Sequence, residues 1–151
     1  GPIFHEGRLY VSSNYGTGSA LLKLARQGEG LAQTEVWRSK DVQNRFSTMV
    51  LNDGHIYGMS EGAFVCAEFL TGAVKWSEKH PNWGNGILAD GHLIVLSATG
   101  RLEIAKATPE GYSPTTRVQV LGGRCWTAPV LHNGKLYVRN QSTVMCLDLK
   151  P

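Results

Sequence analysis

The chain has 151 residues, with 15 Lys and Arg against 12 Asp and Glu, and its formal net charge is +3. The basic residues are scattered singly, which excludes the basic patch typical of nucleic-acid-binding proteins. Hydrophobic residues make up 42% of the chain, yet no run approaches the roughly 20 apolar residues of a membrane span, so we expect a folded globular chain without such a span.

A short hairpin motif recurs four times along the chain. Each copy has an apolar strand, an acidic or amide residue, a glycine, a basic residue and a second apolar strand. The copies occupy residues 2–11, 49–58, 87–96 and 129–138, with turns at Glu6-Gly7, Asp53-Gly54, Asp90-Gly91 and Asn133-Gly134. Asp-Gly and Asn-Gly tolerate the positive φ angles that a two-residue type I′ turn requires, so each copy predicts a β-hairpin.

Further strands are predicted after each hairpin. A third strand is expected at 19–25, 63–69, 101–107 and 143–149, and a fourth at 35–39, 73–77 and 116–121. The turn glycines Gly7, Gly54, Gly91 and Gly134 are spaced by 47, 37 and 43 residues. These spacings match the roughly 40–50-residue period of propeller blades, and the absence of a sustained 3.6-residue apolar period excludes a helical repeat.

The repeats predict an all-β fold, a β-propeller of four-stranded antiparallel blades. About four blades are expected per chain, which is half of a ring of seven or eight. We expect a single propeller segment over residues 1–151, with blades at approximately 2–48, 49–86, 87–128 and 129–151. The last blade is expected to be incomplete, because the sequence stops at Pro151 where the fourth strand should begin.

One segment carries a resemblance to a known family. The sequence AEFLTGAVKW at residues 67–76 resembles the tryptophan-docking motif of quinoprotein propellers, with Ala67, Thr71, Gly72 and Trp76 matching and Glu68 in place of an Asp. In that motif the tryptophan packs between neighbouring blades. Trp37 resembles the same residue one blade earlier.

The resemblance extends over the chain as a whole. Residues 122–150 are similar to the C-terminal end of PQQ-binding-like propeller proteins of Planctomycetes, and the chain is also similar to the outer-membrane assembly lipoprotein BamB. The resemblance implies the C-terminal half of a propeller whose parent protein is periplasmic or extracellular. It says little about activity, because propellers carry many unrelated functions.

The cysteine pattern of this sequence differs from that of the enzymes of this family. PQQ-dependent dehydrogenases hold their cofactor with an adjacent Cys-Cys disulfide, a calcium site of Glu, Asn and Asp, and a catalytic Asp. Cys66, Cys125 and Cys146 are separate in this sequence and form no CxxC pair. We therefore predict no catalytic, cofactor-binding or metal-binding residue and no cofactor. PQQ and calcium enter only if the chain is a fragment of an enzyme whose site lies in missing blades.

A candidate ligand-binding rim comes from the residues eight positions before the turn glycines. These positions hold Phe46, Trp83 and Trp126, and Arg45 and Arg124 lie beside them in the sequence. Aromatic faces flanked by guanidinium groups suit a sugar, a flat ring or an acidic peptide. The alternative is that the rings seal adjacent blades, as most aromatic residues in repeats do.

Repeat position also gives an expectation for the cysteines. Cys66 and Cys146 each follow their turn glycine by 12 residues, and Ile104 occupies the matching strand of the third repeat. This equivalence predicts that both are small buried packing groups. Cys125, near the expected rim, is the one cysteine to test for reactivity.

Two hypotheses for function follow. The first is a non-enzymatic scaffold or recognition module that binds a protein, peptide or glycan; the alternative is a fragment of a PQQ-dependent quinoprotein oxidoreductase. Half a propeller would leave two blade faces open, so we also predict self-association, most economically as a homodimer that completes the ring.

Overall fold

A computed structural model describes residues 1–79 and 84–150. In these ranges the chain forms strands and turns without a helix, in four separate antiparallel sheets. Sheet 1 contains β1 (Ile3–His5), β2 (Arg8–Ser13), β3 (Gly18–Gln27) and β4 (Gly30–Ser39). Sheet 2 contains β5 (Val50–Asn52), β6 (His55–Ser60), β7 (Ala63–Glu68) and β8 (Val74–Lys79). Sheet 3 contains β9 (Gly84–Ala89), β10 (His92–Ser97), β11 (Arg101–Lys106) and β12 (Pro114–Gln119), and sheet 4 contains β13 (Val130–His132), β14 (Lys135–Arg139) and β15 (Val144–Asp148).

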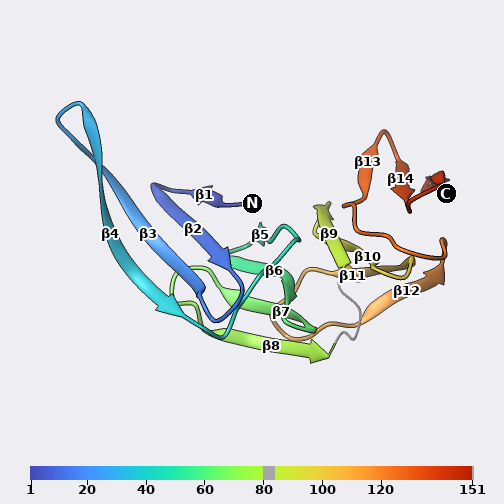
Figure 1. The fold of residues 1–151 in the computed structure, drawn as a ribbon, viewed down its shortest axis with the longest axis horizontal. Helices are drawn as coiled ribbons and strands as arrows, with labels where there is room; N and C mark the ends of the chain where they lie inside the picture. The colour runs from blue at the N-terminus through green and yellow to red at the C-terminus, as the bar shows by residue number, and fades with distance from the viewer. Residues whose placement is uncertain (80–83, 151) are drawn as a thin grey trace.

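Each sheet is a meander in which neighbouring strands of the sequence pair in order. Figure 1 shows the four sheets following one another in chain order around an arc, with sheet 1 at one end and sheet 4 at the other. The predicted all-β propeller fold is therefore confirmed. Sheets 1 to 3 have four strands each, and sheet 4 has three among the described residues.

The predicted hairpin turns form because their residues accept left-handed backbone angles. Asp53 and Gly54 have φ values of 45° and 74°, and the same pair of positive angles occurs at the other three turns. Two consecutive positive φ angles define the type I′ geometry, whose twist matches that of the flanking strands. The four turns set the register from which each blade is built.

Several strands differ from their predicted extents, and the β3–β4 hairpin differs the most. β3 and β4 run well beyond the expected 19–25 and 35–39, because Gln27 pairs with Gly30 across a tight turn containing Gly28 with φ 60°. Figure 1 shows this long hairpin extending beyond β1 and β2, the other two strands of sheet 1. β9 begins at Gly84, ahead of residue 87, from which the third repeat was counted.

Strand pairing gives every sheet two faces, which we call leading and trailing. The leading face, turned toward the next sheet, carries Ile3-Tyr10-Leu21 in sheet 1, Val50-Tyr57-Cys66 in sheet 2, Ile87-Ile94-Ile104 in sheet 3 and Val130-Tyr137-Cys146 in sheet 4. The trailing face carries Phe4-Leu9-Leu22, Leu51-Ile56-Ala67, Leu88-Leu93-Ala105 and Leu131-Leu136-Leu147 in the same order. Alternation of side chains along each strand separates the two sets.

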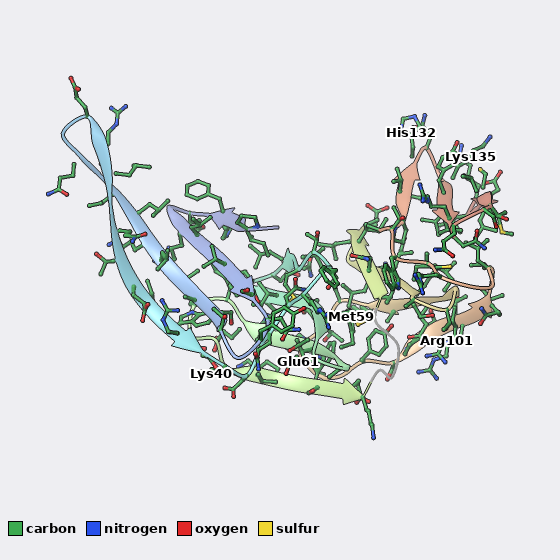
Figure 2. The ribbon with its side chains drawn as sticks, viewed as in Figure 1. Lys40, Met59, Glu61, Arg101, His132 and Lys135 are labelled. Atoms are coloured by element: carbon green, nitrogen blue, oxygen red, sulfur yellow. The ribbon has the colours of Figure 1, made fainter. Side chains whose placement is uncertain are left out.

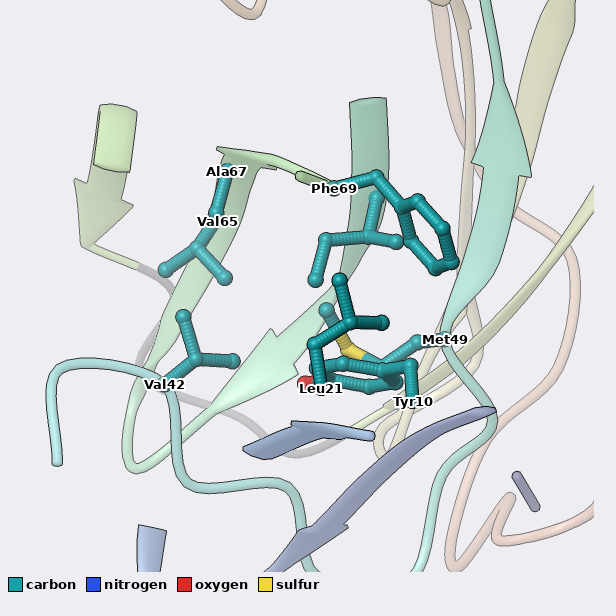
Figure 3. Packing of buried hydrophobic residues seen from close by; sticks show 8 residues of the cluster. Tyr10, Leu21, Val42, Met49, Val65, Ala67 and Phe69 are labelled. Atoms are coloured by element: carbon teal, nitrogen blue, oxygen red, sulfur yellow. The ribbon is translucent and has the colours of Figure 1, made fainter. Parts of the chain in front are cut away.

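The core lies between the sheets, in three apolar clusters. The first cluster joins Tyr10 and Leu21 of sheet 1 to Ile56 of sheet 2 and to Met49, which directly precedes β5. Figure 3 shows Tyr10, Leu21 and Met49 lying together. The second cluster joins sheets 2 and 3, and the third joins sheets 3 and 4. In each cluster a leading face meets the trailing face of the following sheet.

Two tryptophans tie consecutive sheets together. Trp37 Nε1 donates a hydrogen bond to the Phe69 carbonyl over 3.0 Å, and Trp76 Nε1 donates to the Thr108 carbonyl over 2.9 Å. In both cases the acceptor is 32 residues further along the chain. Gly72 lets the Trp37 ring approach, because a Cβ at this position would lie 2.8 Å from a ring carbon.

Gly100 provides a test of close backbone packing. It has φ +86°, and a Cβ there would lie 2.2 Å from the Leu121 carbonyl oxygen. We expect Gly100→Ala to destabilise the fold by more than Gly91→Ala, whose φ is +69° but whose added Cβ would meet no atom within 4 Å. The control should cost about 1–2 kcal/mol for the backbone angle alone. Urea unfolding measures both, and equal losses would contradict the packing argument.

Candidate functional site

The candidate rim residues lie in the segments that connect the last strand of one sheet to the first strand of the next sheet. Arg45 and Phe46 lie between β4 and β5, and Arg124 and Trp126 lie between β12 and β13. Trp83, the fifth predicted residue, lies outside the described residues. Since these segments share one position in the repeat, the fold places them near one another.

A pocket of about 410 Å³ joins most of these residues. Its lining consists of Arg45, Phe46, Ser47, Gly84, Asn85 and Trp126. We call this the rim pocket. Three of the five predicted residues therefore line one cavity, although up to 81 positions separate them in the sequence.

The two described aromatic rings of the pocket are exposed. Phe46 is 76% exposed and Trp126 is 62% exposed, in contrast with the fully buried rings between the sheets. Neither ring is buried between two sheets in this chain, as the alternative interpretation would require. Exposed apolar rings at the mouth of a cavity are available to stack on a ligand.

Guanidinium groups lie against the aromatic rings. The Arg45 Cζ is 4.8 Å from the centre of the Phe46 ring and 5.0 Å from that of Tyr15, and the Arg124 Cζ is 4.5 Å from the centre of the Trp126 ring. These distances are within the range of cation–π contacts, worth roughly 0.5–1 kcal/mol at exposed sites. The contacts orient positive charge and apolar surface together at the pocket.

Buried amides hold the pocket segments in place. Asn44 Nδ2 donates hydrogen bonds to Ser47 Oγ over 2.7 Å and to the Met59 carbonyl over 3.0 Å. Asn85 Nδ2 donates to the Trp126 carbonyl over 3.0 Å, which joins sheet 3 to the segment preceding sheet 4. Both asparagines are 7% exposed, so their hydrogen bonds fix the loops rather than face a ligand.

A smaller pocket adjoins the rim pocket on the side of sheet 4. It measures about 170 Å³ and is lined by Arg124, Trp126, Thr127, Arg139, Asn140 and Gln141. Trp126 lines both pockets. The fourth predicted residue, Arg124, thus lies beside the rim pocket and not in its lining.

Sequence reasoning missed several residues of this site. Ser47, Asn85 and Arg139 were not predicted, and Tyr15 comes from the turn between β2 and β3. Ser47 is adjacent to the predicted pair and could have been included by proximity. Asn85 and Arg139 reach the site only through contacts between sheets, for which the repeat gives no signal.

The cysteine expectations were wrong in two of three cases. Cys66 is buried, and burial raises the pKa of its thiol to about 11. Cys125 is also fully buried, and burial raises its pKa, so it is not the reactive candidate. Cys146 is exposed, because no sheet covers the leading face of sheet 4. The equivalence between repeats correctly placed Cys146 on the leading face of its sheet. It could not show that no further sheet covers this face.

Residues 1–79 and 84–150 contain neither a metal-binding cluster of His, Cys, Asp and Glu nor a membrane-spanning helix. No group of three or more His, Cys, Asp and Glu side chains is arranged to hold a metal ion in this part of the chain. The described residues also contain no helix with the length and apolar character needed to cross a membrane.

The comparisons with known proteins agree on the architecture. No family model and no curated protein matches the sequence. Among solved structures, BamB from Moraxella catarrhalis superposes with a TM-score of 0.74 at 18% identity, over 96% of this chain and 41% of that chain. A europium-containing methanol dehydrogenase gives a TM-score of 0.56 at 17% identity, over 78% of this chain and 24% of its own.

A designed protein is also similar. The computationally designed Ika4 protein gives a TM-score of 0.72 at 11% identity, over 99% of this chain and 89% of that one. This chain thus spans about two fifths of BamB, one quarter of the dehydrogenase and most of Ika4. Together with the four successive antiparallel sheets, these likenesses show that the chain has the fold of the PQQ-type, or quinoprotein-type, β-propellers.

Proposed function

We propose that this chain is a non-enzymatic recognition module that binds an acidic part of a protein, peptide or glycan at the rim pocket. The observation that carries the proposal is the rim pocket itself, where Phe46 and Trp126 offer exposed ring faces and Arg45 offers positive charge. Carboxylates form charge-assisted hydrogen bonds with guanidinium groups, and rings stack on apolar faces. The proposed ligands therefore share two features: a carboxylate group and, next to it, a flat or apolar face.

The architecture supports a scaffold role. Trp37 and Trp76 act in this proposal as docking residues that keep consecutive sheets in register, so that segments from three sheets meet at one pocket. The propeller fold shared with BamB agrees with a scaffold role. We propose that the parent protein is exported, to the periplasm or the extracellular space. We propose in addition that the chain acts as a self-associated pair that completes the ring.

A second candidate function is a fragment of a quinoprotein oxidoreductase. The likeness to methanol dehydrogenase favours it, although the chain covers only 24% of that protein. In this candidate the cofactor ligands belong to blades that are missing from this chain. Dye-linked alcohol oxidation after addition of PQQ and calcium separates the two candidates, since cofactor-dependent turnover would favour the enzyme.

Binding of acidic probes tests the recognition proposal. Calorimetric titration with oligogalacturonate and with a tyrosine-containing oligoglutamate peptide should show binding of at least one, whereas neutral oligosaccharides of equal length should bind more weakly. Loss of a charge-assisted hydrogen bond costs roughly 1.5–3 kcal/mol, so Arg45→Ala should weaken binding about tenfold or more. Trp126→Ala should act in the same direction because it removes a stacking face.

Arg38→Ala is the matched control for this experiment. Arg38 is half-exposed on β4, away from the pocket lining, and pairs with Glu35 over 2.7 Å. Its removal should leave probe binding unchanged. Failure of every acidic probe to bind, or binding that Arg45→Ala and Trp126→Ala leave intact, would contradict the proposal. The two acidic probes distinguish a glycan ligand from a peptide ligand.

A further inference from the structure

The two ends of the arc carry the only sheet faces without a neighbouring sheet in the described structure. Every leading face of sheets 1 to 3 is covered by the trailing face of the next sheet. The leading face of sheet 4 and the trailing face of sheet 1 remain. Figure 2 shows the last hairpin, marked by His132 and Lys135, at the end of the arc with no sheet beyond it.

The leading face of sheet 4 has the composition of a buried blade interface. Tyr137 and Cys146 pair with each other as Tyr57 and Cys66 do in sheet 2. Tyr57 is 1% exposed and Cys66 is 0% exposed under sheet 3, whereas Tyr137 is 38% exposed and Cys146 is exposed.

Two flanking positions repeat the contrast. Val144 occupies the position of Phe64, which is 2% exposed, yet Val144 is 72% exposed. Val130, equivalent to the partly buried Val50, is 59% exposed. Residues of the same or similar apolar type at the same register positions are thus covered in sheet 2 and uncovered in sheet 4.

The trailing face of sheet 1 is the complementary half of this interface. Phe4, Leu9 and Leu22 occupy the positions that Leu88, Leu93 and Ala105 take in sheet 3. Leu88 and Leu93 pack against the leading face of sheet 2. Phe4 is 66% exposed, and Leu9 and Leu22 are half-buried. Sheet 1 therefore presents an apolar surface of the type that covers a leading face elsewhere in the chain.

We infer that the leading face of sheet 4 docks on the trailing face of sheet 1 of a second copy of this chain, and that the same contact repeats in reverse between the two copies. The occupant is a second copy because each chain carries both halves of the interface at opposite ends of one arc. A two-fold rotation satisfies both halves at once and closes the assembly. The contact continues the repeated interface already present between sheets 1 to 4.

This inference deepens the proposed pairing and specifies its surface, and it does not depend on the ligand of the rim pocket. Sedimentation velocity of the chain should give a species of twice 16.5 kDa. Val144→Asp places a carboxylate in the docked face, where burial of an unpaired charge is costly, so it should weaken association at least about tenfold. Leu70→Asp is the matched control, since Leu70 is 51% exposed but lies in the turn after β7, away from both end faces, and should leave the mass unchanged.

Thiol labelling gives a second readout that does not depend on mass. Cys146 in the docked pair should be shielded as Cys66 is within the chain, so maleimide should label it slowly. Dilution below the dissociation constant, or Val144→Asp, should accelerate labelling, while Cys66 and Cys125 stay unlabelled because they are buried in the single chain.

Mixing two variants tests the direction of the contact. Phe4→Asp and Val144→Asp should each weaken self-association, and a mixture of the two should recover a heterodimer, because one of its two contacts has both faces intact. A monomer at all concentrations, an open series of larger species, or rapid labelling of Cys146 at high concentration would overturn the inference. Titration of the monomeric variant with oligogalacturonate then shows separately whether the rim pocket binds.

Discussion

Replacing Phe64 by alanine is expected to lower the free energy of unfolding by about 3–5 kcal/mol. Phe64 is 2% exposed, and its ring centre lies 5.8 Å from that of Trp76 and 4.9 Å from that of Tyr112. Deleting the ring removes apolar burial between sheets 2 and 3 and leaves a cavity that rigid strands on both sides cannot collapse. Guanidinium unfolding followed by circular dichroism measures the loss.

Phe46→Ala is the matched control for Phe64→Ala. It removes the same atoms from a side chain that is 76% exposed, so the unfolding free energy should change by no more than about 1 kcal/mol, including the lost contact with Arg45. Comparable losses for both variants would show that the apolar cluster between sheets 2 and 3 does not stabilise the fold as the structure implies.

Replacing Glu103 by alanine should also destabilise the fold, by about 2–4 kcal/mol from lost burial and a lost hydrogen bond. Glu103 is 1% exposed in β11, accepts a hydrogen bond from the Tyr112 hydroxyl over 2.8 Å and lies 2.8 Å from Arg101 Nε. Burial, together with the Glu103 hydrogen bond and charge, raises the pKa of Tyr112 above its usual range, so this hydroxyl remains a donor. The variant removes the acceptor and opens space beside it.

Two comparisons isolate the contribution of burial at Glu103. Glu35→Ala breaks an ion pair of similar length, 2.7 Å to Arg38, but both side chains are about half exposed, so it should cost less than about 1 kcal/mol. Glu103→Gln keeps the size and an acceptor, and should lie between the two. Equal stabilities of Glu103→Ala and Glu35→Ala in urea would refute the role given to the buried carboxylate.

The repeated hairpins could be predicted because their chemistry is local. Asp53-Gly54 and Asn133-Gly134 determine their own turn angles, and the alternation beside them determines which side chains share a face. The order of strands in each sheet follows from the same turns. The long extension of β3 and β4 escaped prediction, because polar residues such as Gln33 and Thr34 give no apolar pattern while the backbone still pairs.

The candidate site was predictable only in part. Repeat position placed Arg45, Phe46 and Trp126 in equivalent connecting segments, and the structure brings them to one pocket. Repeat position could not show that Asn85 holds the Trp126 carbonyl, since that bond joins different sheets. Repeat position also predicted that Cys146 is buried, as Cys66 is. It was wrong because the repeat position of a residue describes its place within its own sheet and does not show whether another sheet covers it.

The matching of leading and trailing faces has a consequence for how genes of this kind change in length. Each unit of about 40 residues contacts only the units before and after it, as in other repeat architectures. Tandem duplication of a whole unit inserts a piece whose two surfaces already fit its new neighbours, and deletion rejoins surfaces that fit equally well. Length can therefore evolve in steps of one unit, whereas a partial insertion would shift the register that places Tyr57 against Leu93.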